Sequence, residues 1–310
     1  KTSDLGVMVL SATVAIIYTI YSVINFVIFI FSVSSLIQSG NLIVNTFRES
    51  AEVIERSIEE ISDMERISDY SLESYHYKED FYIDCDGFLE LIELEELLEK
   101  HKDQEGMLVI HPSIGDFVSR NQKVASLYYN DWSHLAEDNL PGLKEELLKS
   151  FTVKEKRITT KDYKYSIQKI IDIALRAISP GINDPNTAMK CLDFAGVLLG
   201  KISTVEGCYN CSKTEDSRLA VIYESFNLKK DLEDSLNQIV FYGKEDLCVV
   251  SAVMDALLSS YHQATKENKE IIRDYSNYVY DRTIDNFQHE RERKIIDSRY
   301  ELLNFKENQV

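Results

Sequence analysis

Residues 5–37, LGVMVLSATVAIIYTIYSVINFVIFIFSVSSLI, decide the fold because 24 of these 33 residues are apolar or aromatic. They begin a longer run, Leu5–Phe47, that has no charged side chain, although 28% of the chain is charged. About 20 apolar residues suffice to cross the hydrocarbon core of a bilayer. The sequence therefore predicts a membrane-spanning helix in residues 1–40. The alternative is a buried helical hairpin of a bundle.

A secretory signal peptide fits this run poorly. The apolar region of a signal peptide has about 7–15 residues and ends at a small-residue cleavage site, whereas this run is far longer. Lys1 is not an initiator methionine. We therefore expect that the sequence starts inside a longer chain, in which there is room for further spans upstream.

Hydroxyl and amide side chains interrupt the apolar run. Such groups can line an ion path by replacing the ion's hydration shell, and they are equally suited to hold helices together within a membrane. As candidate pore-lining residues the sequence offers Ser22, Asn25, Ser32 and Ser35.

The formal net charge of −18 restricts the partners of the chain. Nucleic acid is excluded as an expected partner, because binding a polyanion requires a basic surface that releases counterions. The expected partners are the lipid bilayer, further copies of the chain in a homo-oligomer, and ions or a small-molecule ligand.

The cysteines show no disulfide-framework spacing: they are Cys85, Cys191, Cys208, Cys211 and Cys248. Cys208 and Cys211 form a C-x-x-C pair, which is typical of a redox pair or half of a zinc site. No second ligand pair has suitable spacing, so we expect an incidental reduced pair, no metal and no cofactor. Reduced thiols predict that the large domain is cytosolic, and the few basic residues flanking the span agree weakly.

Beyond the span, the sequence predicts a mainly α protein with three further parts. Residues 41–80 are expected to form an amphipathic stalk and a connector, because apolar residues recur at helical spacing through Asn41–Asp69. Asp69–Asp80 is the connector. Residues 81–135 are expected to form a small α/β barrel-like unit, and residues 136–310 an α-helical cytosolic domain.

Apolar runs bounded by glycine and proline predict the strands, and amphipathic runs predict the helices. Strands are expected at Gly87–Ile92, Gly106–His111 and Lys123–Tyr129, with a short helix at Glu93–His101. Longer helices are expected at Tyr163–Ile178, Pro185–Ile202, Arg218–Tyr242, Asp246–Gln263 and Asn268 to about Phe305.

Two of these helices are separated by Ser179-Pro-Gly-Ile-Asn-Asp-Pro185. Pro180 ends the first helix, and Asp184 followed by Pro185 is a helix start signal. The simplest interpretation is a well-capped turn. The functional alternative is a ligand pocket where two helix ends converge. Its candidate ligand-binding residues are Arg157, Asp162, Asp172, Arg176, Ser179, Asn183 and Asp184.

Two motifs carry a family resemblance. The first is Arg157-Ile-x-Thr-x-Asp162 followed by Asp172-Ile-Ala-Leu-Arg-Ala-Ile-Ser-Pro-Gly-Ile-Asn-Asp-Pro-x-Thr-Ala188, and the second is Ile114-Gly-Asp-Phe-Val118. They resemble the signature of a bacterial family of predicted membrane proteins, domain of unknown function 2254. The resemblance implies a multi-pass inner-membrane protein with a cytosolic C-terminal domain, and so residues 1–40 as the last of several spans. It implies no activity, and Asn121 stands where the family tends to have glycine.

Function is predicted less sharply than location. The sequence has no nucleophile elbow, zinc-protease motif or phosphate-binding loop, so we expect no enzyme and no catalytic residue. The first prediction is an oligomeric ion channel or transporter with a cytosolic regulatory domain. The alternative is a membrane-anchored ligand sensor or scaffold that signals through the stalk helix.

Overall fold

The computed structural model describes residues 2–37, 39–62, 64–101, 104–130, 140–158, 161–212 and 218–304. Its contacts divide the chain into two units, Lys1–Asn45 and Thr46–Val310, and each is described by itself below. The chain is mainly α with a sheet region, as the sequence predicts.

The first unit contains the helix α1 (Thr2–Ile37) and the beginning of α2 (Ser39–Glu60). Within α1, Ala12–Phe29 is long and apolar enough to cross a membrane, and none of this stretch is buried within the structure. The predicted passage of one helix into the next falls on residue 38, which lies outside the described residues.

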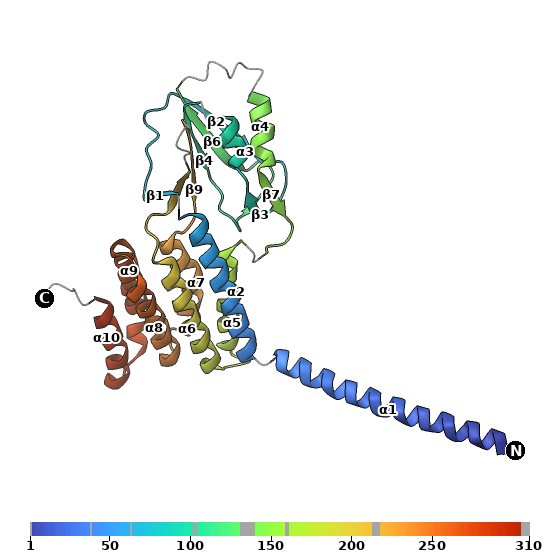
Figure 1. The fold of residues 1–310 in the computed structure, drawn as a ribbon. Helices are drawn as coiled ribbons and strands as arrows, with labels where there is room; N and C mark the ends of the chain where they lie inside the picture. Colours follow the sequence, from blue (N-terminus) through green and yellow to red (C-terminus); the bar gives the residue numbers. More distant parts are fainter. Residues whose placement is uncertain are drawn as a thin grey trace. The chain divides into compact units, whose positions relative to one another are not determined.

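Six strands of the described part of the chain form one sheet within the second unit (Figure 1). Their order is β1-β8-β9-β4-β6-β2, and β4 pairs with β9 in parallel while the other neighbours are antiparallel. The strands are β1 (Glu65–Ile67), β2 (Tyr77–Tyr82), β4 (Gly106–Ile110), β6 (Lys123–Tyr129), β8 (Tyr209–Ser212) and β9 (Leu219–Glu224).

A second, antiparallel sheet has the order β5-β3-β7. It consists of β3 (Gly87–Ile92), β5 (Phe117–Val118) and β7 (Phe151–Lys154), and it is accompanied by the helices α3 (Glu95–Lys100) and α4 (Leu140–Lys149). Side chains from both sheets and both helices share one buried core that includes Leu89, Leu97, Leu127, Leu147 and Val221. The sheets thus take strands from outside residues 81–135, where the sequence predicted a barrel-like unit, because pairing between distant strands leaves no local signal.

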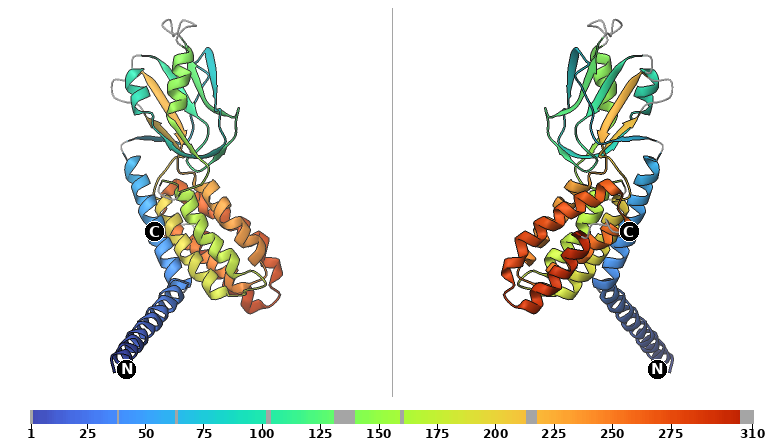
Figure 2. Two further views of the ribbon diagram at one scale, coloured as in Figure 1. Left: turned by 90° about the vertical axis from the view of Figure 1, so that its right-hand side faces the viewer. Right: turned by 90° about the vertical axis from the view of Figure 1, so that its left-hand side faces the viewer.

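Helices form the other end of the second unit (Figures 1 and 2). They are α5 (Tyr163–Ala177), α6 (Pro185–Ile202), α7 (Leu228–Gly243), α8 (Leu247–Gln263), α9 (Lys266–Thr283) and α10 (Glu290–Asn304), with the short 3₁₀ helix η1 (Ile284–Asn286) before α10. Five of them begin at a side chain that accepts a hydrogen bond from a free backbone N–H of the first turn. These caps are Asp162, Asp184, Asn227, Asp246 and Thr265.

The helix α2 packs along this bundle instead of standing free as a stalk. The ring of Phe47 stacks on Phe194 of α6 with 4.5 Å between centroids, and the hydroxyl of Ser50 donates to the carbonyl oxygen of Ser166 in α5 at 3.1 Å. Glu55 meets Lys201 at the far end of α6. Because Phe47 and Glu55 contact α6 in the same order along both helices, α2 runs parallel to α6.

Three predicted helices differ from the structure. The helical pattern of Asn41–Asp69 ends at Glu60, because β1 pairs with β8 and those backbone bonds override the local periodicity. Arg218–Tyr242 is wrong as a single helix: its start is the strand β9, and Asn227 caps a separate α7. The last predicted helix is interrupted at Ile284–Asn286, where the side chains of Ile284 and Phe287 belong to a small buried cluster.

Part of the predicted connector is also a strand. The residues Tyr77–Tyr82 form β2, which pairs along β6. The tyrosines of this segment stack across the ladder, as Tyr77 does on Tyr129 with 5.4 Å between centroids. Polarity alone predicts a loop here, whereas cross-strand aromatic pairs stabilise a sheet.

Candidate functional site: a charged cavity between the sheets and the helices

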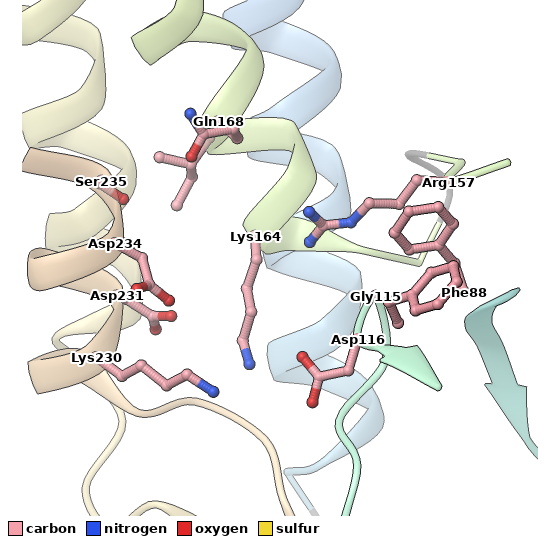
Figure 3. A pocket seen from close by; sticks show the side chains of 12 residues that line it. Phe88, Gly115, Asp116, Arg157, Lys164, Gln168, Lys230, Asp231, Asp234 and Ser235 are labelled. Atoms are coloured by element: carbon pink, nitrogen blue, oxygen red, sulfur yellow. The ribbon is translucent and has the colours of Figure 1, made fainter. Parts of the chain in front are cut away.

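A cavity of about 390 Å³ lies where the turn before β5 meets the first turns of α5 and α7 (Figure 3). Its walls carry both signs of charge and two phenylalanine rings. The lining residues are Phe88, Gly115, Asp116, Phe117, Arg157, Lys164, Ile167, Gln168, Lys230, Asp231, Asp234 and Ser235. The cavity therefore brings together segments that lie far apart in the sequence.

One wall is built from the ion pair between Arg157 and Asp162. Arg157 Nε donates to Asp162 Oδ2 at 2.5 Å and Arg157 Nη2 donates to Asp162 Oδ1 at 3.1 Å. Asp162 is 3% exposed and also caps α5 by accepting from the backbone N–H of Tyr165. A two-pronged bond to a capping carboxylate fixes the guanidinium in one orientation. Its charge is thereby largely neutralised before any ligand arrives.

Gly115 fits against this ion pair. Its φ is +90°, and a Cβ added there would run into the Asp162 carboxylate and approach Arg157 Nη2 at 2.8 Å. The motif Ile114–Val118 therefore meets the motif Arg157–Asp162 directly. Both the backbone conformation and the lack of a side chain are needed at this position.

We expect Gly115→Ala to destabilise the folded chain by roughly 2–3 kcal/mol, because it adds backbone strain and displaces the Arg157–Asp162 pair. Thermal or urea unfolding of the full chain in detergent micelles measures this change. Gly181→Ala is the matched control, since its Cβ would have no heavy atom within 4 Å. Equal stability of the two variants would contradict the close approach at Gly115.

The opposite wall contains a buried carboxyl group. Asp231 on α7 is 3% exposed, and the hydroxyl of Tyr163 donates to its Oδ2 at 2.9 Å. Burial raises the pKa of Asp231 to about 7, while the nearby Lys164 ammonium and the Tyr163 bond act in the lowering direction. Burial and the charge of Asp231 raise the pKa of Tyr163 well above its ordinary value, so this phenol stays protonated. Asp231 is thus a carboxyl group that changes charge near neutral pH.

Lys164 extends into the space between these walls. In Figure 3 its side chain passes between the α7 carboxylates and the turn that carries Asp116. The Nζ atom is buried and has no hydrogen-bond partner among the described residues, although it lies 5.9 Å from the centroid of the Tyr163 ring. The other two cations of the wall have anionic partners, Arg157 in Asp162 and Lys230 in Glu224 at 4.0 Å. Of the described cations that line the cavity, Lys164 is therefore the one available to a ligand.

The structure brings together only part of the predicted ligand-binding set. Arg157 and Asp162 lie at the cavity. The other five residues lie toward the far end of α5 and in the turn after it: they are Asp172, Arg176, Ser179, Asn183 and Asp184. Asp172 accepts a hydrogen bond from Gln168 of the lining at 2.8 Å but does not itself line the cavity, and the turn after α5 begins about 22 Å along this 15-residue helix.

The turn at Ser179–Pro185 has the predicted local structure. Asp184 accepts hydrogen bonds from the backbone N–H of Thr187 at 3.1 Å and from the Thr187 hydroxyl at 2.6 Å. These bonds lower the pKa of Asp184. Asn183 has a φ of 49°, in the left-handed region that asparagine tolerates. Asn121, where the family tends to have glycine, also adopts this region with a φ of 63°.

Sequence reasoning missed Asp116, Lys164, Lys230, Asp231 and Asp234. A usable signal existed for the α7 residues, because Asn227 is a helix cap and the charged residues after it form the first turn of a new helix. Predicting one helix over Arg218–Tyr242 concealed that signal. Lys164 is the second residue of α5, two positions after the Asp162 cap, and no pattern in the sequence marked it.

The candidate pore-lining residues belong to α1. The Asn25 side-chain amide donates to the carbonyl oxygen of Tyr21 at 2.8 Å, so it has a partner within its own helix. The side chain of Ser22 is exposed. The side chains of Ser32 and Ser35 lie outside the described residues.

The C-x-x-C pair lies at β8. Backbone pairing of the strand extends to Cys208, whose carbonyl oxygen accepts from the N–H of Ser225. Cys211 lies within β8, and Cys208 lies in the bend directly before that strand.

The described chain thus combines an apolar helix able to cross a membrane with a large unit that contains a charged cavity. Comparison with protein families agrees with the membrane assignment. The chain matches the family described as "Predicted membrane protein (DUF2254)" over residues 1–259, and it belongs to that family.

Individual relatives are more distant. The chain is similar to the uncharacterized protein Rv1290c of Mycobacterium tuberculosis and to the uncharacterized protein Mb1321c of Mycobacterium bovis. Each is 24% identical over 106 residues, which is 34% of this chain and 20% of the relative. The match thus spans about a fifth of the length of these curated relatives. No solved structure matches the chain.

Proposed function

We propose that this chain is a membrane-anchored sensor that binds a small organic anion in the cavity between α5, α7 and the turn before β5. The observation that carries this proposal is the buried Lys164 ammonium, which lacks a hydrogen-bond partner among the described residues. Burying a charge without a partner is costly. A carboxylate or phosphate group of a ligand would supply that partner.

The remaining walls narrow the ligand class. The carboxylates of Asp116 and Asp234 favour ligand groups that donate hydrogen bonds, such as hydroxyl or amino groups. The rings of Phe88 and Phe117 meet edge to face with 5.1 Å between centroids and favour a flat or apolar portion. The volume of about 390 Å³ suits a metabolite. A nucleoside monophosphate combines all three properties.

The packing of α5 suggests how binding would be transmitted. Lys164 lies in the first turn of α5. Two residues further on, the carbonyl oxygen of Ser166 accepts the hydrogen bond from the Ser50 hydroxyl of α2. If α5 can adopt two placements in the bundle, a ligand that binds more tightly to one of them shifts the conformational equilibrium toward that placement. Because α2 lies against α5, this shift would reach the segment that leads toward α1.

A thermal-shift experiment on the full chain in lipid nanodiscs tests the proposal. The probes are inorganic phosphate, adenosine monophosphate, glutamate and succinate, each compared with sodium chloride at equal ionic strength. A ligand at 100 times its Kd stabilises the folded state by about 2.7 kcal/mol, so at least one probe should raise the Tm by several degrees. If none of the four raises it at pH 6 or at pH 8, the sensor proposal fails.

An oligomeric ion channel or transporter is the second candidate. Its support is the family's membrane assignment together with Ser22 and Asn25 on a helix whose apolar stretch is not buried within the structure. A pore requires several such helices around an axis, so this candidate also requires a homo-oligomer. Ion flux into liposomes that contain the full-length protein tests it, and Asn25→Leu should change conductance.

The proposed location is the bacterial inner membrane, with several spans and the large unit in the cytosol. The free thiols of Cys85, Cys191, Cys208 and Cys248 support a reducing compartment. Labelling of the exposed Cys248 in intact cells with a membrane-impermeant thiol reagent tests the orientation. Reaction before lysis would place this unit outside.

A further inference from the structure

The end of the helical bundle that carries the Ser179–Pro185 turn has an exposed aromatic and apolar surface. We name it the lower face and define it by Ile182, Phe241 and Tyr242. Their side chains are 54%, 53% and 70% exposed. A contiguous group of exposed large apolar side chains marks a surface that contacts another protein or a membrane.

The lower face is one continuous place in the fold. Phe241 and Tyr242 form an edge-to-face pair with 5.1 Å between centroids at the end of α7. The following Gly243 packs against α5, because a Cβ there would lie 3.7 Å from Ile178 Cδ1. Ile178 ends α5 directly before the turn that contains Ile182. Figures 1 and 2 show the α5–α6 and α7–α8 connections at the same end of the bundle.

The direction of α2 connects this face to the membrane. Since α2 runs parallel to α6, the chain enters the bundle from the end where α6 begins, which is the end of the lower face. Thr46, where the second unit starts, is 17 residues after Phe29, the last residue of the apolar stretch. The lower face is therefore at the end of the bundle where the chain enters the second unit.

We propose that the lower face rests on the headgroup region of the bilayer. Tyrosine and other aromatic side chains are enriched at that depth, where their rings are apolar and their polar ends remain hydrated. Lys244, with Nζ 5.9 Å from the centroid of the Phe241 ring, can extend its ammonium to lipid phosphates. Asp184, Glu245 and Asp246 lie nearby in the sequence. The contact is consequently apolar and aromatic and does not depend on anionic lipid.

The test places a tryptophan in the lower face of the full chain. Tyr242→Trp is made in a Trp132→Phe background, which removes the chain's single tryptophan. The protein is reconstituted into phosphatidylcholine nanodiscs with bromine atoms on the lipid acyl chains near the headgroups. Tyr77→Trp in the same background is the matched control, because Tyr77 is 58% exposed but lies on β2 in the sheets.

Because aromatic rings at the interface sit beside the lipid chains, we expect bromine to remove about half of the Tyr242→Trp fluorescence and to leave the Tyr77→Trp fluorescence unchanged. The loss should be the same at low and high salt. If aqueous iodide quenches the fluorescence of the Tyr242→Trp variant as strongly as that of the control, the proposal is overturned. Shielding from iodide without quenching by bromine would also overturn it, and would assign the lower face to a second copy of the chain.

Discussion

Replacing Lys164 by methionine should reduce the affinity of the cavity for its anionic ligand by about 10- to 100-fold. A hydrogen bond between charged groups contributes about 1.5–3 kcal/mol, and each 1.4 kcal/mol is a factor of ten in Kd. Methionine keeps the length and apolar contacts of the lysine stem and removes only the ammonium. The measurement is the ligand-induced rise in Tm of the full chain in nanodiscs, with adenosine monophosphate as the probe.

The same variant has a second expected result that a general loss of structure would not give. Without ligand at pH 5, where Asp231 is protonated in the folded chain, Lys164→Met should be as stable as the parent protein or more stable, since an unopposed buried charge is gone. Lys169→Met, on the same helix but outside the cavity lining, should keep both the stability and the ligand response. Unchanged affinity in the Lys164 variant would show that the anion does not bind at this ammonium.

Asp231 should make the stability of the fold depend on pH. Burial raises its pKa from the ordinary 3.8 to about 7, so between these values the folded chain holds a proton that the unfolded chain has lost. The free energy of unfolding should therefore fall as the pH rises from about 4 to 7, and this contribution should be constant above that. Its upper limit is roughly 4 kcal/mol. The charged and titratable groups facing Asp231 are Lys164, Tyr163, Asp234 and Glu224.

Asp231→Asn removes this titration while keeping the shape of the side chain. The variant should exceed the stability of the parent protein by a smaller margin at pH 5 than at pH 8.5, measured by urea unfolding in micelles. Asp234→Asn, on the same helix, is the control. Parallel pH curves for parent and Asp231→Asn would contradict the raised pKa. Ligand affinity should also rise toward pH 6, because a protonated Asp231 leaves the charge of Lys164 unopposed.

Local signals were sufficient for much of the helical fold. The bounds of α6 follow from the Asp184 cap, Pro185 at the first helical position and the apolar period that ends at Ile202. The strands at Gly87–Ile92 and Lys123–Tyr129 also agree with prediction, since each is a short apolar run next to a turn signal. These features depend on residues within a few positions of each other, so a single sequence contains them.

The cavity could not be predicted in the same way. Asp116, Lys164 and Asp231 come from a turn, α5 and α7, and only the tertiary fold decides that they face one space. Arg157 and Asp162 were found because they belong to a motif, yet most of their charge is used within their own pair. The residue that is available to a ligand, Lys164, stands beside this motif and carries no pattern of its own.

The parallel pairing of β4 with β9 has a consequence for how the chain is synthesised. A ribosome completes β4 at Ile110 but reaches the end of β9 only at Glu224. Until then, one edge of the apolar strand β4 is without its neighbour, and exposed strand edges promote aggregation. The sheet of the nascent chain therefore remains incomplete while α5 and α6 are synthesised. We therefore expect that fragments ending before Glu224 need chaperones to stay soluble, however well their helices form.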